Sequence, residues 1–252
     1  MTIEPRVGAS RLSPPADLSL SPGEVHVWRA SLDVSASRIQ SLLRTVSADE
    51  RARAERSRVQ EDRDRFIVGR GVLRGLLARY LDIQPDQVCL SSTLYGKPIL
   101  TGTHGGARLR FSVSHSHRLA LYAVSRDREV GIDLEYRRPG RDETLMAIAE
   151  QFFSSREVKA LRRLPVSGRA EGFYACWTRK EAYLKAKGRG LSLPLDQFVV
   201  SVTPGCAALL HTAWSPDEAA RWSLSDLDPG PGYAAALAVE GECQCVQWQW
   251  PD

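Results

Sequence analysis

Long apolar runs are absent from this chain of 252 residues. No stretch approaches the roughly 20 apolar residues that a helix needs to cross a bilayer. The polar, proline-containing start lacks the apolar core of a signal peptide. We therefore expect a cytoplasmic protein with no membrane partner, in which residues 1–20 form a loose tail.

Cysteine is scarce, and its pattern excludes disulfide scaffolds and zinc sites. The five cysteines include no Cys-x-x-Cys pair, and the close pair Cys243 and Cys245 would point to opposite faces of a strand. The five histidines do not join the cysteines at the spacing of zinc ligands. We expect all five cysteines to be reduced packing residues, as is usual inside cells.

A strong charge of one sign is also missing, because the net charge is only +4, with 43% hydrophobic and 25% charged residues. This composition is typical of a globular protein with a sizeable core. In the stretch 51–79, nine arginines against four acids leave a local charge of +5. A nucleic-acid-binding face is one interpretation, although no interleaved aromatics, zinc finger or RNA-recognition motif accompany it. Attraction of an anionic ligand or an acidic partner is a second interpretation. A solvated helix face, on which many of these arginines do nothing specific, is the third.

Two acidic residues share one face of a predicted strand at 130–136, VGIDLEY. Side chains alternate along a strand, so the apolar residues at 130, 132 and 134 point one way, and Asp133 and Glu135 point the other. Two carboxylates this close repel each other unless a cation or a base lies between them. Magnesium prefers such oxygen ligands and leaves room for substrate phosphates. A solvated strand face, with its acids paired to surface arginines, is the simpler alternative.

A third carboxylate lies beside the apolar stripe of a predicted helix at 169–187. Phe173, Trp177 and Leu184 recur at helical spacing, and Glu181 falls between the last two. A carboxylate in this position is costly unless it is paired or binds a metal. Lys185 lies one turn further on, so a simple Glu181–Lys185 ion pair is the alternative.

The order of predicted elements indicates an α+β protein of two similar αβ lobes. The first half has a strand at 25–30, helices from a capping box at 47–50 to residue 81, and strands at 88–93, 107–113 and 119–124. The second half has a strand at 130–136, helices at 142–151, 155–164 and 169–187, and strands near 197–203, 207–213, 221–226 and 233–239. A boundary in the turn at 126–129 gives lobes of 21–127 and 128–252, with an active site expected between them.

Five motifs occur in a specific order: YGKP at 95–98, FSVSHS at 111–116, VGIDLE at 130–135, FF at 152–153 and WTRKEAYLKAKGRGLSLPL at 177–195. In this order and spacing the chain resembles the phosphopantetheinyl transferases of the surfactin-synthetase-activating (Sfp) type. The resemblance runs from about residue 47 to about residue 195, with a looser tail. It implies the two-lobed fold, and it implies an enzyme that moves 4'-phosphopantetheine from coenzyme A to a serine of an apo acyl or peptidyl carrier protein, releasing 3',5'-ADP.

The resemblance also implies roles for individual residues. Magnesium would be held by Asp133, Glu135 and Glu181. The positions that match coenzyme A contacts are Arg53, Arg65, Arg70, Lys97, Ser114, His115 and Lys185. The catalytic candidates are Glu181 as the base that takes the serine proton, directly or through a water, with Lys185 and His115 as donors to phosphate oxygens.

Three positions depart from the family pattern. Ser112 stands where many relatives carry asparagine, Glu50 stands where some carry a basic residue, and Arg53 stands where lysine occurs in some. One phosphate contact near residue 50 is therefore expected to be missing or moved, and Arg53 contacts phosphate differently from lysine.

Several alternatives remain open from the sequence. His115 between two serines also suits a structural hydrogen-bonding role. A basic nucleic-acid-binding adaptor, a relative that binds coenzyme A without transfer, and a metal-dependent hydrolase are the rival functions. Fatty-acid, polyketide, nonribosomal-peptide and lysine-pathway carriers all fit the resemblance. The two-lobed length favours a monomer.

Overall fold

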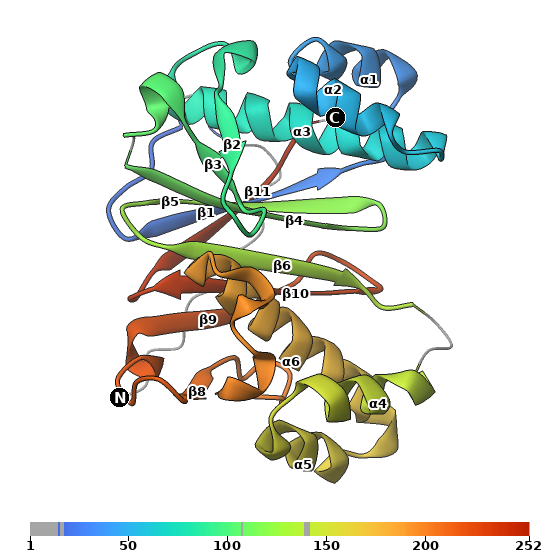
Figure 1. Ribbon diagram of the computed structural model, residues 1–252, viewed down its shortest axis with the longest axis vertical. Coiled ribbons are helices and arrows are strands. Elements are labelled where there is room, and N and C mark those ends of the chain that lie inside the picture. The colour runs from blue at the N-terminus through green and yellow to red at the C-terminus, as the bar shows by residue number, and fades with distance from the viewer. Residues whose placement is uncertain (1–14, 16–17, 107, 139–141, 252) are drawn as a thin grey trace.

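The computed structural model describes residues 15, 18–106, 108–138 and 142–251 (Figure 1). The helices are α1 Ala36–Leu43, α2 Ala48–Glu55, α3 Gln60–Leu81, α4 Asp142–Phe152, α5 Ser155–Arg163 and α6 Val166–Lys187. The strands are β1 Glu24–Ser31, β2 Leu90–Ser92, β3 Pro98–Leu100, β4 Leu109–Ser116, β5 Leu119–Arg126, β6 Val130–Tyr136, β7 Phe198–Val200, β8 Leu209–Thr212, β9 Trp222–Leu227, β10 Tyr233–Glu240 and β11 Gln244–Gln249. The predicted tail at 1–20 and loop at 137–142 lie largely outside the described residues.

The elements stack in four layers, which confirms the predicted α+β class (Figure 1). Helices α1 and α3 cover one face of a four-stranded sheet with the order β11-β1-β5-β4. The other face of that sheet packs on a three-stranded sheet with the order β6-β10-β9. Helices α4, α5 and α6 cover the far side of the second sheet. Each of these two sheets is therefore buried on both faces. None of the described helices is long and apolar enough to cross a membrane.

Helix α3 organises the first half of the molecule. Its buried positions Val68, Val72 and Leu76 recur every four residues and pack on Trp28 of β1 in one core. The helix ends at Asp82, whose left-handed backbone (φ 53°) stops the hydrogen-bonding pattern. The expected capping box at 47–50 is present and begins α2.

Helix α6 lies directly against β6 in the second half, and Gly131 permits this approach. A Cβ atom at Gly131 would lie 1.9 Å from the carbonyl oxygen of Ala182 and 2.4 Å from the amide nitrogen of Ala186. No side chain fits at those distances, so glycine sets how closely the strand and the helix pack. The residues of β6 on the same face as Gly131 therefore point at α6.

The two halves meet through an apolar core between the sheets. Val25, Val27 and Leu121 from the first sheet pack against Ile132 and Leu237 from the second. The predicted apolar face of 130–136 is thus confirmed, and it is the interface between the sheets. This burial removes apolar surface from water on both sheets and holds the halves together.

Two strands were not among the predicted elements. β3 pairs with β2 as a short hairpin. β11, from the last residues of the chain, pairs in parallel with β1, with Trp28 opposite Trp248. The boundary at 127/128 stays a prediction, and it needs one modification, because β11 belongs to the sheet of the first half.

Candidate active site

Asp133 lies at the centre of the site, buried between β6 and α6 with 3% of its surface exposed. Its Oδ1 accepts hydrogen bonds from Ser114 Oγ of β4 at 3.0 Å and from Lys185 Nζ of α6 at 2.6 Å. Its Oδ2 is buried and has no hydrogen-bond partner in the structure. A buried carboxylate oxygen without a partner is costly, so Oδ2 is suited to bind a cation.

Glu181 faces the same site from α6. Burial, and after it the negative charges of Asp133 and Glu135, together raise the pKa of its carboxyl to about 7, although Lys185 opposes them. The ion pair of Lys185 in this structure is with Asp133, not the Glu181 pair that helical spacing also allowed. Glu181 is therefore a carboxylate that readily takes or releases a proton near neutral pH.

Glu135 completes the acidic group. It is half-buried and accepts a hydrogen bond from Ser116 Oγ at 3.4 Å and another from Trp177. Burial raises the pKa of its carboxyl, and the charge of Asp133 adds to that shift. The predicted alternation of β6 is correct, but the acidic face is not solvated, because α6 covers it.

These carboxylates fit a divalent cation. Within the described residues, no three His, Cys, Asp or Glu side chains already lie at the positions of metal ligands. The unpartnered Oδ2 of Asp133 and the raised pKa values of Glu135 and Glu181 nevertheless mark a region with excess negative charge. A hard cation accepts oxygen ligands of this kind and relieves their repulsion. The assignment of these three residues as metal ligands stays a prediction.

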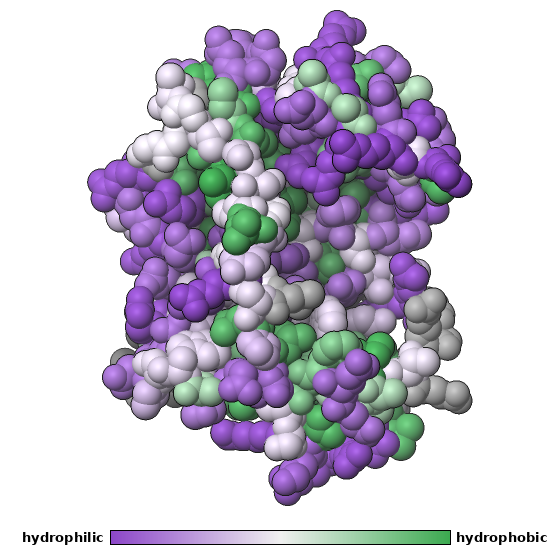
Figure 2. Space-filling model, viewed as in Figure 1, coloured by the Kyte–Doolittle hydropathy of each residue, from purple (hydrophilic) through white to green (hydrophobic). Residues whose placement is uncertain are grey.

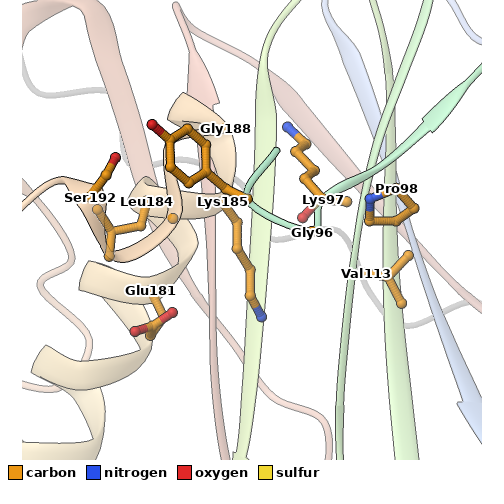
Figure 3. Close-up of a pocket in the computed structure, with 12 residues that line it drawn as sticks. Gly96, Lys97, Pro98, Val113, Glu181, Leu184, Lys185, Gly188 and Ser192 are labelled. Atoms are coloured by element: carbon orange, nitrogen blue, oxygen red, sulfur yellow. The ribbon is translucent and has the colours of Figure 1, made fainter. Parts of the chain in front are cut away.

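A cavity of about 450 Å³ opens beside Glu181 and Lys185 (Figure 3). The α6 residues lie on one side, and Lys97 and Pro98 of the β2–β3 hairpin lie on the other. The third wall is the segment after α6, where Gly188 ends the helix in a left-handed conformation (φ 65°). The β2–β3 hairpin of the first half, and α6 with the segment after it from the second half, thus line one cavity.

A second cavity of about 280 Å³ adjoins the first. The two cavities share Gly96, Pro98 and Val113 in their walls. The second is lined by four of the predicted coenzyme A contacts: Arg53, Arg65, Arg70 and His115. Arg53, Arg65, Arg70 and His115 thus line the second cavity, and Lys97, Glu181 and Lys185 line the first, whereas Ser114, Asp133 and Glu135 are in neither lining.

The cations of the second cavity differ in how they are held. Arg53 and Arg70 lie over the ring of Phe66, at 5.4 and 5.5 Å from its centre. Arg65 donates two hydrogen bonds to Asp33, at 2.8 and 3.3 Å, so it is already engaged. Arg70 is held less tightly, since its Nε lies 3.9 Å from Glu50 Oε1, so Arg53 and Arg70 can turn toward an anion more easily than Arg65.

Glu50 has a structural role that explains its departure from the family pattern. Its Oε2 accepts hydrogen bonds from Arg74 at 2.7 Å and from the amide of Ser47, and its Oε1 lies 3.9 Å from Arg70. The acid therefore neutralises the buried Arg74 and fixes the start of α2. The capping pattern in the sequence did not predict the ion pair with Arg74.

His115 and Lys97 are both shifted toward their neutral forms. Burial lowers the pKa of His115, and the positive charges of Lys185, Arg70 and Arg53 lower it further. Burial also lowers the pKa of Lys97, against the attraction of Glu129 at 3.5 Å. Lys97 Nζ donates to the carbonyl oxygen of Val130 at 3.2 Å, which ties the hairpin to β6.

The segment WTRKEAYLK divides between two faces of α6. Glu181 and Lys185 face the cavity, whereas Lys180 is fully buried on the other side. Lys180 Nζ lies 2.8 Å from Glu157 Oε1 and donates to the carbonyl oxygens of Leu195 and Phe198. Lys180 therefore holds the second half together and takes no part in the cavity. The predictions also missed Trp177 as a partner of Glu135, because the helical pattern had marked Trp177 only as a core residue.

Comparison with known proteins identifies the family of the chain. Residues 129–238 match the family model of the 4'-phosphopantetheinyl transferase superfamily, and residues 28–127 match that of the 4'-phosphopantetheinyl transferase N-terminal region.

Three relatives illustrate the range of similarity. The chain is 44% identical to the 4'-phosphopantetheinyl transferase HetI of Nostoc sp. over 230 residues, 91% of this chain and 93% of the relative. It is 28% identical to the 4'-phosphopantetheinyl transferase Sfp of Bacillus subtilis over 77% of this chain and 82% of that protein. It is also 28% identical to the L-aminoadipate-semialdehyde dehydrogenase-phosphopantetheinyl transferase of Xenopus laevis, over 82% and 72%. The chain therefore belongs to the 4'-phosphopantetheinyl transferase family of enzymes.

Proposed function

We propose that this enzyme transfers 4'-phosphopantetheine from coenzyme A to a serine hydroxyl of apo acyl or peptidyl carrier proteins. The main support is the pair of adjacent cavities, with arginines in the second and Glu181, Lys97 and Lys185 in the first, where Lys185 is paired with the buried Asp133. A ligand with several phosphates and a long neutral arm matches this division of charge and space. HetI and Sfp are both named as 4'-phosphopantetheinyl transferases, which supports transfer of this group.

Arg53 and Arg70 would hold the phosphate at the nucleotide end, and Lys97 would reach the phosphates near the reaction centre. Their positive charges attract the anion, and guanidinium groups can bind it with two hydrogen bonds. Arg65 would contribute only if it exchanges Asp33 for the ligand. Ser114, His115 and Lys185 complete the proposed binding set, with His115 and Lys185 as donors to the pyrophosphate oxygens.

Asp133, Glu135 and Glu181 would hold magnesium. When bound, the ion would neutralise pyrophosphate oxygens and stabilise the leaving 3',5'-ADP. The carrier serine oxygen attacks the phosphorus that bears the pantetheine arm, the bond from that phosphorus to the bridging oxygen breaks, and the serine proton is taken by Glu181. Glu181 is suited to this role because it lines the cavity beside Lys185.

We further infer that the protein acts as a monomer in the cytoplasm. The described cavity is built by elements of a single chain, so no second copy is needed to complete it. All five cysteines are free, including the neighbours Cys243 and Cys245, as expected in a reducing compartment.

The test is to incubate the purified protein with coenzyme A, magnesium and apo carriers of the fatty-acid, polyketide, nonribosomal-peptide and lysine pathways, and to read intact masses. We expect at least one carrier to gain the mass of one phosphopantetheine group, and we expect chelation of magnesium to prevent this. If no carrier gains mass while the protein stays folded, the proposed transfer is wrong. Binding to nucleic acid that weakens steeply with salt would then support the adaptor alternative.

A further inference from the structure

Three serines of β4 form a regular contact with the neighbouring strand β6. The two strands lie side by side at the edges of different sheets (Figure 1). The hydroxyl oxygens of Ser112, Ser114 and Ser116 accept hydrogen bonds from the amides at 132, 134 and 136, at 3.1, 3.2 and 3.0 Å. Each serine is 20 residues from the residue whose amide it accepts, so the contact runs in constant register.

Alternation along the strand explains this arrangement. Residues two apart on β4 point to the same side, so all three hydroxyls reach the edge of β6. Buried amide groups need acceptors, and here serine oxygens take the place that carbonyl oxygens of a neighbouring strand would fill. Serine side chains thus join the edges of the two sheets. We name residues 112, 114 and 116 the serine ladder.

A hydroxyl that accepts from an amide still has its own proton to donate. Ser114 donates to Asp133 Oδ1 at 3.0 Å, and Ser116 donates to Glu135 Oε2 at 3.4 Å. Both pairs are separated by 19 residues in the sequence. The residue 19 positions after Ser112 is Gly131, which has no side chain to receive a proton. Two members of the ladder therefore reach the acidic group, and the first does not.

We propose that Ser114 and Ser116 are positioning residues for the carboxylates of the proposed metal site. Ser112, which also lines the first cavity, joins the halves without positioning either carboxylate. Ser114 and Lys185 together occupy Oδ1 of Asp133, which leaves the buried Oδ2 as the oxygen presented to a cation. Partners of this kind fix the orientation of a ligand before the metal arrives. The inference rests on the proposed function, because it takes Asp133 and Glu135 as metal ligands.

The three serines supply a matched set of variants. Binding of Mn²⁺ to the free protein is measured by electron paramagnetic resonance for Ser112→Ala, Ser114→Ala and Ser116→Ala, with thermal unfolding in parallel. We expect all three to lower the unfolding temperature, because each leaves one amide of β6 without its acceptor. We expect Mn²⁺ affinity to fall roughly 10-fold or more in Ser114→Ala, to fall less in Ser116→Ala, whose hydrogen bond is longer, and to stay unchanged in Ser112→Ala.

Restoring the hydroxyl separates positioning from packing. Ser114→Thr keeps the donor and should recover most of the lost Mn²⁺ affinity. In steady-state assays, Ser114→Ala should show a raised requirement for metal at an unchanged KM for the carrier. Equal loss of Mn²⁺ affinity in Ser112→Ala and Ser114→Ala would overturn the proposal, and so would an unchanged affinity in Ser114→Ala. If Ser114→Ala does not fold, an unchanged affinity in Ser116→Ala overturns it, and a selective loss supports it.

A further variant distinguishes this inference from the proposed metal site. Asp133→Asn removes the charge but keeps the shape of the side chain. If Asp133→Asn binds Mn²⁺ like the unaltered protein, the metal-site assignment itself is wrong. If Asp133→Asn loses Mn²⁺ while Ser114→Ala keeps it, the metal site stands and the positioning role of the serine ladder is wrong.

Discussion

The carboxyl of Glu181 combines three properties in one side chain: it is half-buried, it lines the cavity, and its pKa is raised to about 7. Burial is the largest cause of that shift, and the nearby acids add to it. A buried group of this kind destabilises the fold when it is charged, so its presence here indicates a chemical role more than a packing role.

Replacement of Glu181 by Gln should separate its chemical role from its effect on stability. Glu181→Gln keeps the size but cannot take a proton, so we expect transfer to fall by a factor on the order of 10²–10⁴. The unfolding temperature should be equal or higher, because a buried charge is removed. The mass assay and thermal unfolding measure the two outcomes. Transfer at a near-normal rate would remove Glu181 from both proposed roles, as base and as metal ligand.

His26 should make the stability of the first half depend on pH. It is 3% exposed, and its Nδ1 lies 2.7 Å from the hydroxyl of Tyr80. Burial lowers its pKa below the ordinary 6.5, and Glu24 only partly opposes this. In the window below 6.5 the unfolded chain therefore binds more protons than the folded one, so stability falls as the pH falls.

Unfolding temperatures between pH 7 and pH 5 test this. Glu181 acts in the opposite direction over this range, because its raised pKa, about 7, lets the folded protein bind more protons than the unfolded chain. The test is therefore the difference between two proteins. We expect the unfolding temperature of the unaltered protein to fall relative to that of His26→Gln as the pH is lowered, because Gln keeps a hydrogen-bonding side chain but cannot become charged. The lowered pKa of His115 acts in both proteins alike. The same pH dependence in both proteins would show that His26 is not a cause.

At the scale of elements, the contact between β6 and α6 decides the geometry of the site. Gly131→Ala would place a Cβ against main-chain atoms of α6, which cannot move aside as a side chain can. We expect a loss of about 1–3 kcal/mol or more in the free energy of unfolding by urea. Gly168→Ala, a substitution in α6 itself, is the control, since an added Cβ there meets nothing within 4 Å. That variant should gain up to about 1 kcal/mol from helix propensity.

Local patterns predicted the elements that build the acidic group. Alternation gave strand β6 with Asp133 and Glu135 on one face, and helical periodicity gave α6 with Glu181 beside its apolar stripe. Neither pattern predicts which strand edge from the other half lies alongside. The hydrogen bonds from Ser114 to Asp133 and from Lys185 to Asp133 therefore had no signal in the sequence. Burial of both faces of β6 was equally hidden, because it depends on α6 packing over the acids.

β3 and β11 escaped prediction for different reasons. β3 has three residues and begins with a proline, too short for alternation to appear. β11 pairs in parallel with β1, and no turn connects the two strands to signal the pairing. Parallel pairing across most of the chain is a property of the whole fold, which local patterns do not contain.

At the scale of the whole molecule, the end of the chain completes the core of the first half. Trp248 and Trp250 are buried in the same cluster as Trp28 and helix α3. The ring of Trp250 packs against the bare backbone of Gly75, where an added Cβ would lie 3.2 Å from it.

Removal of that ring should therefore weaken a region distant in sequence. We expect Trp250→Ala to lower the free energy of unfolding by about 3 kcal/mol. Hydrogen exchange should show the lost protection in α3 as well as in β11. Leu94, at 92% exposure, gives the control, and Leu94→Ala should change stability little. Lost protection confined to β11 would contradict the structural role given to its aromatic side chains.

The pairing of β1 with β11 also governs the order of events during synthesis. Domains usually fold as they leave the ribosome, starting from the amino-terminal side. Here the first-made sheet keeps an open edge beside β1 until Gln244–Gln249 has emerged, because that segment is its last strand. In a nascent chain, the four-stranded sheet is thus complete only after β11 has been synthesised. A product that stops short of residue 244 exposes the edge of β1, which is a template for aggregation.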